Sequence, residues 1–312
     1  MKLLVLPEDG MTAVVNAIKA ASKSIDTTIF RFDRAEIEKA LETAVGRGVK
    51  VRTLIAHTNR GGDKMLRKLE LRLLGAGVTV ARSAEDLARY HAKFMVIDGR
   101  TLFVMLFNFT ALDAKSRSFG VITTQRAPVL EACRLFEADV TRQVCAPVPQ
   151  VLVVSPENAR KRLTEFLKGA KKSLWIYDPK INDSATVRIL EERVQKGVDV
   201  RVLGTVGKRA KQFKADRMKS LRLHARVIIR DGRDAFFGSQ SLRTAELDSR
   251  REVGLIVKNP KVLKTVMATF EKDWAETKVA KVEAKEEAKE EAKVEAKEEA
   301  KAAAGEPAPG SA

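Results

Sequence analysis

The chain has 312 residues, of which 45% are hydrophobic and 32% are charged. That balance is typical of a globular protein with one large core or two of about half that size. No apolar run reaches the roughly 18 residues of a membrane-spanning helix. The net charge of +17 points to an anionic partner, either nucleic acid or a phospholipid surface, although a solubilising surface gives the same charge.

The start of the chain is predicted to be a buried strand rather than a signal peptide. Met1–Leu6 is apolar, but Pro7 follows at once, which is too early for a signal sequence. Without a leader or a membrane span, the default localisation is the cytoplasm or the periphery of a membrane. Cys133 and Cys145 form no CxxC pair, so we expect neither a zinc site nor a disulfide framework, and we expect no metal or other cofactor.

Strands alternate with amphipathic helices from the N-terminus onward. The predicted strands are Leu3–Leu6, Ser24–Phe30 and Lys50–Ala56, and the predicted helices are Gly10–Ala21 and Arg34–Gly46. This alternation predicts an α/β layer structure with a largely parallel sheet.

The same pattern returns 149 residues later, so the chain contains an internal repeat. Pro7-Glu8-Asp9 matches Pro156-Glu157-Asn158, Lys23-Ser24-Ile25 matches Lys172-Ser173-Leu174, and Gly48-Val49-Lys50-Val51-Arg52 matches Gly197-Val198-Asp199-Val200-Arg201. Prolines at 147 and 149 interrupt the pattern between the copies. We therefore expect two homologous halves, residues 1–146 and 150–277.

The first half carries about 16 extra residues within Asn59–Leu87, because the offset between the copies shrinks from 149 to 133 beyond that segment. Lys64–Leu74 in this insertion is predicted to be a basic helix. An insertion in one copy is where a substrate-specific surface is expected, but a plain surface helix explains the pattern equally well.

Residues 278–312 are predicted to be a tail without catalytic content. They repeat Glu, Ala and Lys and carry seven lysines and nine glutamates, so their net charge is −2 and the remainder carries +19. Glu–Lys pairs four residues apart favour a solvated helix, but almost no apolar stripe is present for packing. We expect this low-complexity segment to be part helix and part disordered.

Two of the three histidines begin similar ten-residue segments at matching positions of the repeat. The segments are His91-Ala92-Lys93-Phe94-Met95-Val96-Ile97-Asp98-Gly99-Arg100 and His224-Ala225-Arg226-Val227-Ile228-Ile229-Arg230-Asp231-Gly232-Arg233. In an extended strand, residues two apart share a face, so each histidine is expected to project beside the cation that follows it. The Asp-Gly pairs predict turns to further strands at Leu102–Phe107 and Ala235–Gly238.

An imidazole beside a fixed cation suits phosphate chemistry. The cation neutralises the non-bridging oxygens, while the imidazole attacks phosphorus or protonates the leaving oxygen. A single His–Lys pair is usually an ordinary surface pair, but two copies in a duplicated chain are a much stronger signal. His57 has no counterpart in the second copy and is interpreted as a loop residue.

The pattern H-x-K-x4-D, repeated in two α/β halves, resembles the phospholipase D superfamily, and the resemblance covers residues 1 to about 277. It implies two α/β/α sandwich halves related by a pseudo-twofold axis, with both motifs meeting between them. It also implies that one histidine forms a phosphohistidine, that the other protonates the leaving alcohol, and that no metal is required. Asn108 and Ser239 stand where the family binds phosphate, and Asp98, Asp231 and Gly238 occupy structural positions of the motifs.

The departures from the family pattern make the halves unequal. Met105-Leu106 replace the usual Gly-Ser, Arg226 replaces the second lysine, and Ser241 stands where the family often has Asn. The family places an acidic residue after each motif to orient an imidazole. Here Glu252 precedes Val253-Gly254, but Ser118 precedes Phe119-Gly120. On the family pattern, Glu252 orients His91 as the nucleophile, and His224 is the general acid without a carboxylate partner. The catalytic set is therefore His91, Lys93, His224, Arg226 and Glu252.

Three functions remain open at this stage. The first is hydrolysis or transfer at a phospholipid phosphodiester, with an anionic membrane surface as a further partner, by a chain expected to be monomeric because it holds both motifs. The second is a nuclease of the same superfamily, although aromatic residues are only 5% and no basic run is interleaved with them. The third is a non-catalytic module that binds phosphates or anionic membranes.

Three clusters of basic residues are interpreted mainly as solvated helix faces, with part of the last one beside the site. They lie at Arg160–Arg162, Lys171–Lys172 and Lys208–Lys219.

Overall fold

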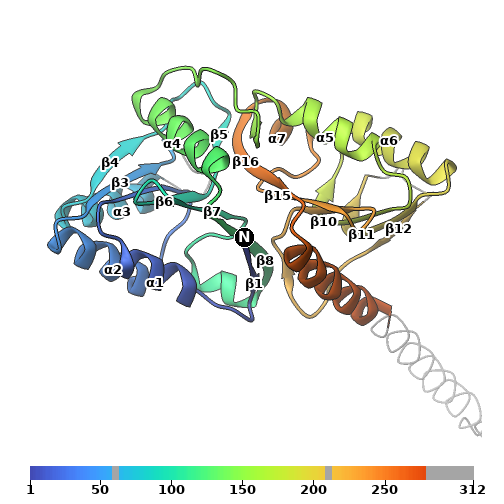
Figure 1. Ribbon diagram of the computed structural model, residues 1–312, viewed down its shortest axis with the longest axis horizontal. Helices are drawn as coiled ribbons and strands as arrows, with labels where there is room; N and C mark the ends of the chain where they lie inside the picture. The colour runs from blue at the N-terminus through green and yellow to red at the C-terminus, as the bar shows by residue number, and fades with distance from the viewer. Residues whose placement is uncertain (58–62, 208–212, 279–312) are drawn as a thin grey trace, which may run out of the picture.

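The computed structural model describes residues 1–57, 63–207 and 213–278, which form two α/β halves lying side by side (Figure 1). The tail expected over 278–312 lies outside the described residues except for Lys278. Among the residues described, no helix is long and apolar enough to cross a membrane. The two-lobed α/β architecture predicted from the repeat is confirmed.

The first half is built on a sheet with the strand order β1-β8-β7-β6-β2-β3-β4. Its strands are β1 (Lys2–Leu6), β2 (Ser24–Ile29), β3 (Lys50–Ile55), β4 (Thr79–Arg82), β6 (Phe94–Ile97), β7 (Thr101–Met105) and β8 (Ser116–Thr123). Only the pairs β2–β3 and β3–β4 are parallel, and the remaining neighbours run antiparallel. The expectation of a largely parallel sheet is therefore wrong. A tight hairpin joins β6 to β7, and the chain then turns back through Ala111–Lys115 into β8, so the strands after the motif are antiparallel neighbours.

The second half repeats this topology, with the strand order β12-β11-β10-β14-β15-β16 and β9 paired with β16. Its strands are β9 (Leu152–Ser155), β10 (Ser173–Ile181), β11 (Asp199–Val206), β12 (Lys214–Asp216), β14 (Val227–Arg230), β15 (Asp234–Gly238) and β16 (Arg250–Val257). Here too β10, β11 and β12 are parallel, whereas β14, β15 and β16 are antiparallel. The two sheets are therefore homologous mixed sheets.

Helices cover both faces of each sheet, as the α/β/α expectation requires. They are α1 (Thr12–Ala20), α2 (Ala35–Gly46), α3 (Asp63–Gly75), α4 (Arg126–Thr141), α5 (Ala159–Lys168), α6 (Ser184–Gln195), the short α7 (Thr244–Asp248) and a helix over 260–278. The basic helix expected at Lys64–Leu74 corresponds to α3. Its Arg67 pairs with Glu70 of the same helix and its Arg72 pairs with Glu38 of α2, so these two charges are paired.

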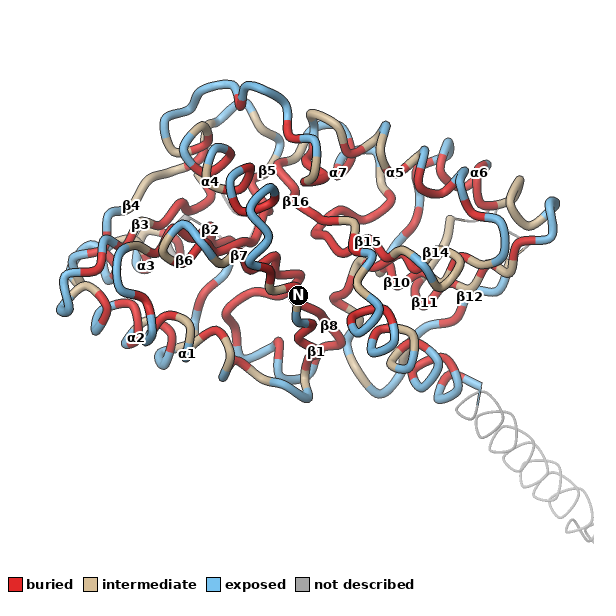
Figure 2. The backbone as a smooth tube through the Cα atoms, in the orientation of Figure 1, coloured by how far each residue is buried: buried red, intermediate tan, exposed pale blue. Residues whose placement is uncertain are grey.

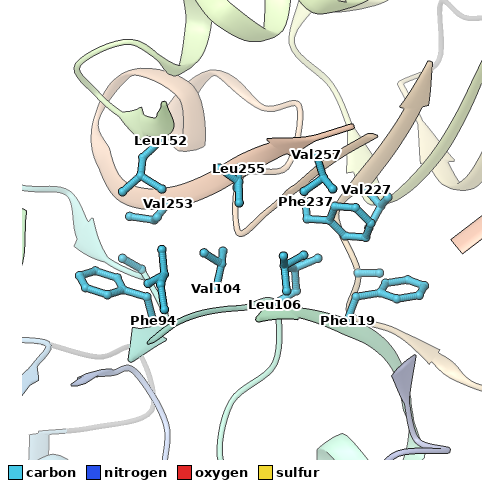
Figure 3. Packing of buried hydrophobic residues seen from close by; sticks show 14 of the residues in the cluster. Phe94, Val104, Leu106, Phe119, Leu152, Val227, Phe237, Val253, Leu255 and Val257 are labelled. Carbon is cyan, nitrogen blue, oxygen red and sulfur yellow. The ribbon is translucent and has the colours of Figure 1, made fainter. Parts of the chain in front are cut away.

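The hydrophobic core has three parts, and the largest lies between the two sheets. Helices α1, α2 and α3 cover the outer face of the first sheet, and α5 and α6 cover the outer face of the second. The inner faces pack against each other and against α4 and the helix over 260–278 (Figure 2). Figure 3 shows Phe94, Val104 and Leu106 of one half facing Val253 and Leu255 of the other. Burial of this shared apolar surface holds the halves in one arrangement.

Two short strands, one from each half, pair with the sheet of the other half. β5 (Arg89–Tyr90) pairs with β16 of the second half, and β13 (Arg222–Leu223) pairs with β8 of the first half. Each crossing strand lies directly before a motif histidine. The chain therefore enters each motif from the opposite sheet, which brings both motifs to the junction.

Buried ion pairs reinforce the junction. Arg117, at the start of β8, contacts Asp273 of the 260–278 helix with Nε 2.7 Å from Oδ2. Arg251, on β16, contacts Asp139 of α4 with 3.0 Å between Nη2 and Oδ1. Both arginines are almost fully buried, and each has a second carboxylate partner, Glu8 for Arg117 and Glu157 for Arg251, so both buried charges are compensated twice.

The basic clusters serve mainly local structure. Arg160 pairs with Asp183 and Asp248, and Arg162 donates to the carbonyls of Val151 and Leu152. Residues 208–212 of the third cluster lie outside the described part of the chain.

Candidate active site

Each motif histidine lies in a short irregular segment between two strands. His91 follows β5 and precedes β6, and His224 follows β13 and precedes β14. The expectation that each histidine sits within one continuous strand is therefore wrong. Their backbones are nevertheless fixed, because His91 N donates to Arg251 O at 2.8 Å and His224 N donates to Arg117 O at 3.0 Å. Both bonds reach the opposite half.

His91 contacts the carboxylate that the sequence assigns to it. Its Nδ1 lies 2.8 Å from Oε2 of Glu252, which belongs to β16 of the second half. Lys93 Nζ lies 3.0 Å from His91 Nε2 and donates to the carbonyl of His91 at 2.9 Å. The ammonium has only donors, so this geometry assigns the proton to Nδ1 and the lone pair to Nε2. The Phe30 ring packs edge-on against the imidazole, with 4.7 Å between the ring centroids.

His224 also faces a carboxylate from the opposite half, contrary to the expectation from Ser118. Asp113 Oδ1 lies 3.6 Å from His224 Nδ1 and is almost fully buried. That distance is longer than a hydrogen bond, so the pair is looser than His91–Glu252. Ser118 instead donates its hydroxyl to the carbonyl of His224 at 3.4 Å.

Asp113 is the functional candidate that the sequence reasoning missed, although the repeat contained a signal for it. It lies five residues after Asn108 and accepts a hydrogen bond from the Asn108 backbone N at 3.3 Å. Glu246 lies five residues after Ser241 and accepts from the Ser241 backbone N at 2.8 Å. The two acids occupy equivalent positions 133 residues apart. Only the acid of the first half faces the other half's histidine.

Arg226 is anchored differently from Lys93. Its Nη1 donates to the carbonyl of His224 at 3.2 Å, and its Nε donates to Ser241 Oγ at 3.1 Å. The small Ser241 therefore supplies an acceptor for the longer cation. In the first half Asn108 holds the matching position, and its buried Oδ1 has no hydrogen-bond partner among the residues described. Asn108 and Lys93 line one small cavity.

The two halves also differ at the positions where the family usually has Gly-Ser, which are Gly238-Ser239 in the second half and Met105-Leu106 in the first. Ser239 Oγ accepts from the Val253 backbone N at 3.1 Å, which ties this residue to β16 beside Glu252. A side chain at Gly238 would collide with the ring of Phe236, so glycine is required there. In the first half Met105 and Leu106 are buried in the core. The expected phosphate contact of Ser239 stays a prediction, since its hydroxyl already bonds to the backbone.

Burial and mutual repulsion among cations control the charges of the site. Burial, followed by Lys93 and Arg226, lowers the pKa of His91 well below its usual range. Burial lowers the pKa of Lys93 to about 7 and raises that of Glu252 to about 7. Burial likewise lowers the pKa of His224 to about 3, although Asp113 opposes it. In the substrate-free site both imidazoles are therefore neutral at pH 7.

The motif aspartates lie away from the chemistry. Asp98 accepts hydrogen bonds from the backbone N of Lys23 and Ser24, and Asp231 accepts from those of Lys172 and Ser173. Each aspartate has a positive φ in the turn after a motif strand. The repeated Lys-Ser pairs thus occupy equivalent places in the two halves, where their backbone N–H groups cap the turn. The structural role expected for both aspartates fits these contacts.

His57 is placed apart from these groups. It lies two residues after the end of β3 (Lys50–Ile55), and its Nε2 is 3.4 Å from Oε1 of the exposed Glu85. This surface contact fits the loop interpretation.

The sequence pattern of the family described as cardiolipin synthase, PLD-like domain, matches residues 14–139 and 163–274. The chain therefore belongs to this family of the phospholipase D superfamily. Membership supports an enzyme of the phosphodiesterase or transferase type.

Two curated relatives are similar over part of the chain. A mitochondrial cardiolipin hydrolase of Danio rerio is 25% identical over 153 residues, which are 49% of this chain and 65% of that protein. The mitochondrial cardiolipin hydrolase of Homo sapiens is 27% identical over 122 residues, which are 38% of this chain and 45% of that protein. The chain thus spans less than two thirds of the length of either relative.

Solved structures show the same fold. Polyphosphate kinase from Porphyromonas gingivalis superposes with a TM-score of 0.73 at 18% identity, over 88% of this chain and 50% of that one. Phosphatidylserine synthase from Haemophilus influenzae superposes with a TM-score of 0.65 at 14% identity, over 88% of this chain and 85% of that one. These likenesses concern architecture alone.

Proposed function

We propose that the protein hydrolyses or transfers phosphodiesters of phospholipid head groups through a phosphohistidine formed on His91. The observation that carries the proposal is the buried 2.8 Å contact between His91 Nδ1 and Glu252 Oε2. Glu252 holds the Nδ1 proton and keeps the lone pair on Nε2, which contacts Lys93 Nζ at 3.0 Å in the substrate-free site and exchanges that contact for phosphorus when substrate binds. Lys93 and Arg226 supply positive charge for the non-bridging oxygens of the phosphate.

In the first step, His91 Nε2 forms a bond to phosphorus while the bond to the leaving alcohol breaks. His224 gives its proton to the leaving oxygen. In the second step, water or an acceptor alcohol attacks phosphorus, His224 takes its proton, and the phosphorus–nitrogen bond breaks. Because cations and burial depress the pKa of His224, the negative charge of a bound phosphate is what raises it toward the range of a general acid.

Two features of the site favour lipid over nucleic acid. Phe30, Tyr90 and Phe109, which lie next to His91 or line the small cavity with Lys93, are each buried and cannot stack on bases. Leu112, which precedes Asp113 in the chain, is 45% exposed and presents an apolar side chain at the surface. A lipid head group connected to acyl chains suits this combination of buried rings and exposed leucine.

The proposal is tested by trapping the intermediate. Rapid acid-free quenching with a ³²P-labelled phospholipid, followed by peptide mapping, is expected to place the label on His91. Recovery of label on His224 would reverse the assignment of nucleophile and acid. His91→Asn is expected to give no labelled protein. Arg100→Gln serves as a control that should still be labelled, because Arg100 is exposed in the turn after β6.

A nuclease is the second candidate because the residues before the tail carry +19, which suits DNA electrostatically. Plasmid, single-stranded DNA and phospholipid vesicles are compared over a series of salt concentrations, with His91→Ala as the control. Turnover of DNA alone would favour the nuclease. Binding without turnover of any substrate would favour a non-catalytic phosphate or membrane module.

A further inference from the structure

The backbone that carries Lys93 is held by a threonine side chain beyond the end of a strand ladder. β6 lies between β2 and β7 in the first sheet (Figure 2). The antiparallel ladder between β2 and β6 ends at the pair Thr27–Met95, two residues short of Lys93. Beyond that pair, the motif segment is bonded to the hydroxyl of Thr28, a residue that is only 1% exposed.

The Thr28 hydroxyl bonds to both neighbours of Lys93. Its Oγ1 accepts from the backbone N of Phe94 at 2.9 Å and donates to the carbonyl of Ala92 at 3.0 Å. The Phe94 carbonyl is farther away, at 3.5 Å, so the hydroxyl proton points to Ala92. One hydroxyl offers a single donor together with acceptor lone pairs, and both functions are used here. Thr28 therefore fixes the backbone on either side of Lys93.

The position of the Lys93 ammonium depends on this clamped backbone. On the other side, Met105 of β7 donates its backbone N to the Lys93 carbonyl at 2.9 Å. From there the side chain places Nζ 3.0 Å from His91 Nε2 and 2.9 Å from the His91 carbonyl. Thr28 and Lys93 also line the same small cavity, together with Asn108. A shift of the clamped backbone would therefore change the distance between the ammonium and Nε2.

The second half lacks this clamp. Tyr177 is the equivalent of Thr28, 149 residues later in the chain. Its pairing with Val227 continues the backbone ladder of β10 and β14 by one further pair. Its hydroxyl is used elsewhere, since it donates to Asp273 Oδ2 at 2.7 Å. The hydroxyl clamp thus belongs to the half that holds the proposed nucleophile.

We propose that Thr28 is a positioning residue, whose hydroxyl sets the place of the Lys93 ammonium against His91 Nε2 and against a bound phosphate. This inference rests on the proposed function, because that function assigns Lys93 to the non-bridging oxygens. A cation stabilises charge that develops on those oxygens only when it is preorganised at short distance. A misplacement of about 1 Å can cost about 10²-fold in rate.

Thr28→Val tests the clamp, because valine keeps the β-branched shape and removes the two hydrogen bonds. With glycerol p-nitrophenyl phosphate as substrate, kcat is expected to fall by about 10- to 100-fold, whereas KM changes much less. Thr28→Ser retains the hydroxyl and is expected to keep most of the wild-type kcat. Steady-state rates, taken well below the unfolding temperature of each variant, measure both parameters.

Two matched substitutions separate positioning from stability. Thr53 of β3 is equally buried, and its hydroxyl has no hydrogen-bond partner among the residues described, so Thr53→Val should leave kcat unchanged. Thr123 ends β8, and its Oγ1 accepts from the backbone N of Gln125 at 3.1 Å, so Thr123→Val should lower stability but not kcat. A wild-type kcat in Thr28→Val overturns the proposal. So does an equal loss of kcat in Thr28→Ser or in Thr123→Val.

A spectroscopic measurement separates this inference from the catalytic proposal. If no ester is turned over, the proposed function fails, but the ¹⁵N resonance of His91 Nε2 in the substrate-free protein still reports the contact with the Lys93 ammonium. His91→Asn assigns this resonance, since the chain has only three histidines. Thr28→Val is expected to move it toward the position of an imidazole nitrogen without a donor, whereas Thr28→Ser and Thr53→Val should leave it in place. An unmoved resonance in Thr28→Val refutes the positioning role.

Discussion

The two motif segments share a backbone arrangement but differ in how their side chains are held. In the first, His91 is hydrogen-bonded to Glu252 at 2.8 Å and its cation is Lys93. In the second, His224 stands 3.6 Å from Asp113 and its cation is Arg226, anchored on Ser241. A nucleophile needs a fixed tautomer and direction, whereas a general acid must change its protonation state during the reaction. The tight pair and the loose pair fit these separate roles.

Replacing the histidines should have the largest effect and should separate their roles. His91→Asn is expected to lower kcat/KM by about 10⁴-fold or more for every ester, because no nucleophile remains. His224→Asn is expected to lower it by about 10²–10⁴-fold for an alkyl ester but much less for a p-nitrophenyl ester, whose leaving group needs no proton. Steady-state rates with both esters measure the difference. Equal losses on the two esters in His224→Asn would contradict its role as acid.

Replacing the carboxylates should have an intermediate and unequal effect. Glu252→Gln is expected to lower kcat by about 10³-fold, since the amide no longer accepts the Nδ1 proton as a carboxylate does. Asp113→Asn is expected to cost about tenfold, because a 3.6 Å contact is not a hydrogen bond in the substrate-free protein. A larger loss in Asp113→Asn than in Glu252→Gln would reverse the comparison. Circular dichroism controls for folding.

For a p-nitrophenyl ester, whose leaving group needs no proton from His224, the pH dependence of kcat/KM should reflect the first motif. Glu252 must be ionised, and its pKa is raised to about 7 by burial, so activity should rise with pH through that value. Lys93 must be protonated, and its pKa is lowered to about 7, so activity should fall again above it. The result is a bell-shaped profile centred near neutrality. Lys93→Arg should move the alkaline limb upward if the variant retains activity, and an unmoved limb would exclude Lys93 as its origin.

The smallest effect on catalysis is expected for the motif aspartates. Burial acts to raise the pKa of Asp98, but the backbone N–H groups of Ser24, Lys23 and Ser22 outweigh it and lower the pKa from 3.8 to about 2. Because the folded-state pKa is depressed, this stabilisation is present above about pH 4 and is lost as the pH falls toward 2. Asp98→Asn should lower the free energy of unfolding by about 2 kcal/mol at pH 7.

Asp231→Asn tests the same turn in the second half, where the pKa is also lowered by backbone contacts that outweigh burial. Denaturant unfolding at pH 7 and pH 3 measures both variants, and each should differ less from the wild type at the lower pH. A loss of activity without a loss of stability in either variant would place that aspartate in the chemistry instead.

The repeat made much of this molecule predictable. The offset of 149 residues correctly placed the homologous elements, since Pro7-Glu8-Asp9 and Lys23-Ser24 hold turns that both sheets need. The contact between His91 and Glu252 also followed from the motifs. At Asp9 and Asn158 a local backbone requirement determined the residue type, because each side chain accepts a hydrogen bond from the backbone N four residues earlier, whereas the His91–Glu252 contact followed from the family pattern.

What the sequence did not reveal depends on contacts between the halves. The antiparallel half of each sheet was missed because hydrophobic runs report burial and not strand direction. Asp113 was missed because its pairing with His224 joins residues 111 positions apart, and only the equivalence with Glu246 points to it. The crossing strands β5 and β13 are two residues each, which is too short for any periodicity.

Those crossing strands make assembly of the site a late event in folding. Glu252 is 161 residues from His91, so closing this contact requires ordering a large part of the chain first. Each half can form its local βαβ units early, but a paired imidazole exists only after β5 and β13 have docked on the opposite sheets. Recovery of activity during refolding should therefore lag behind recovery of secondary structure, so that enzymatic turnover reports completion of the fold.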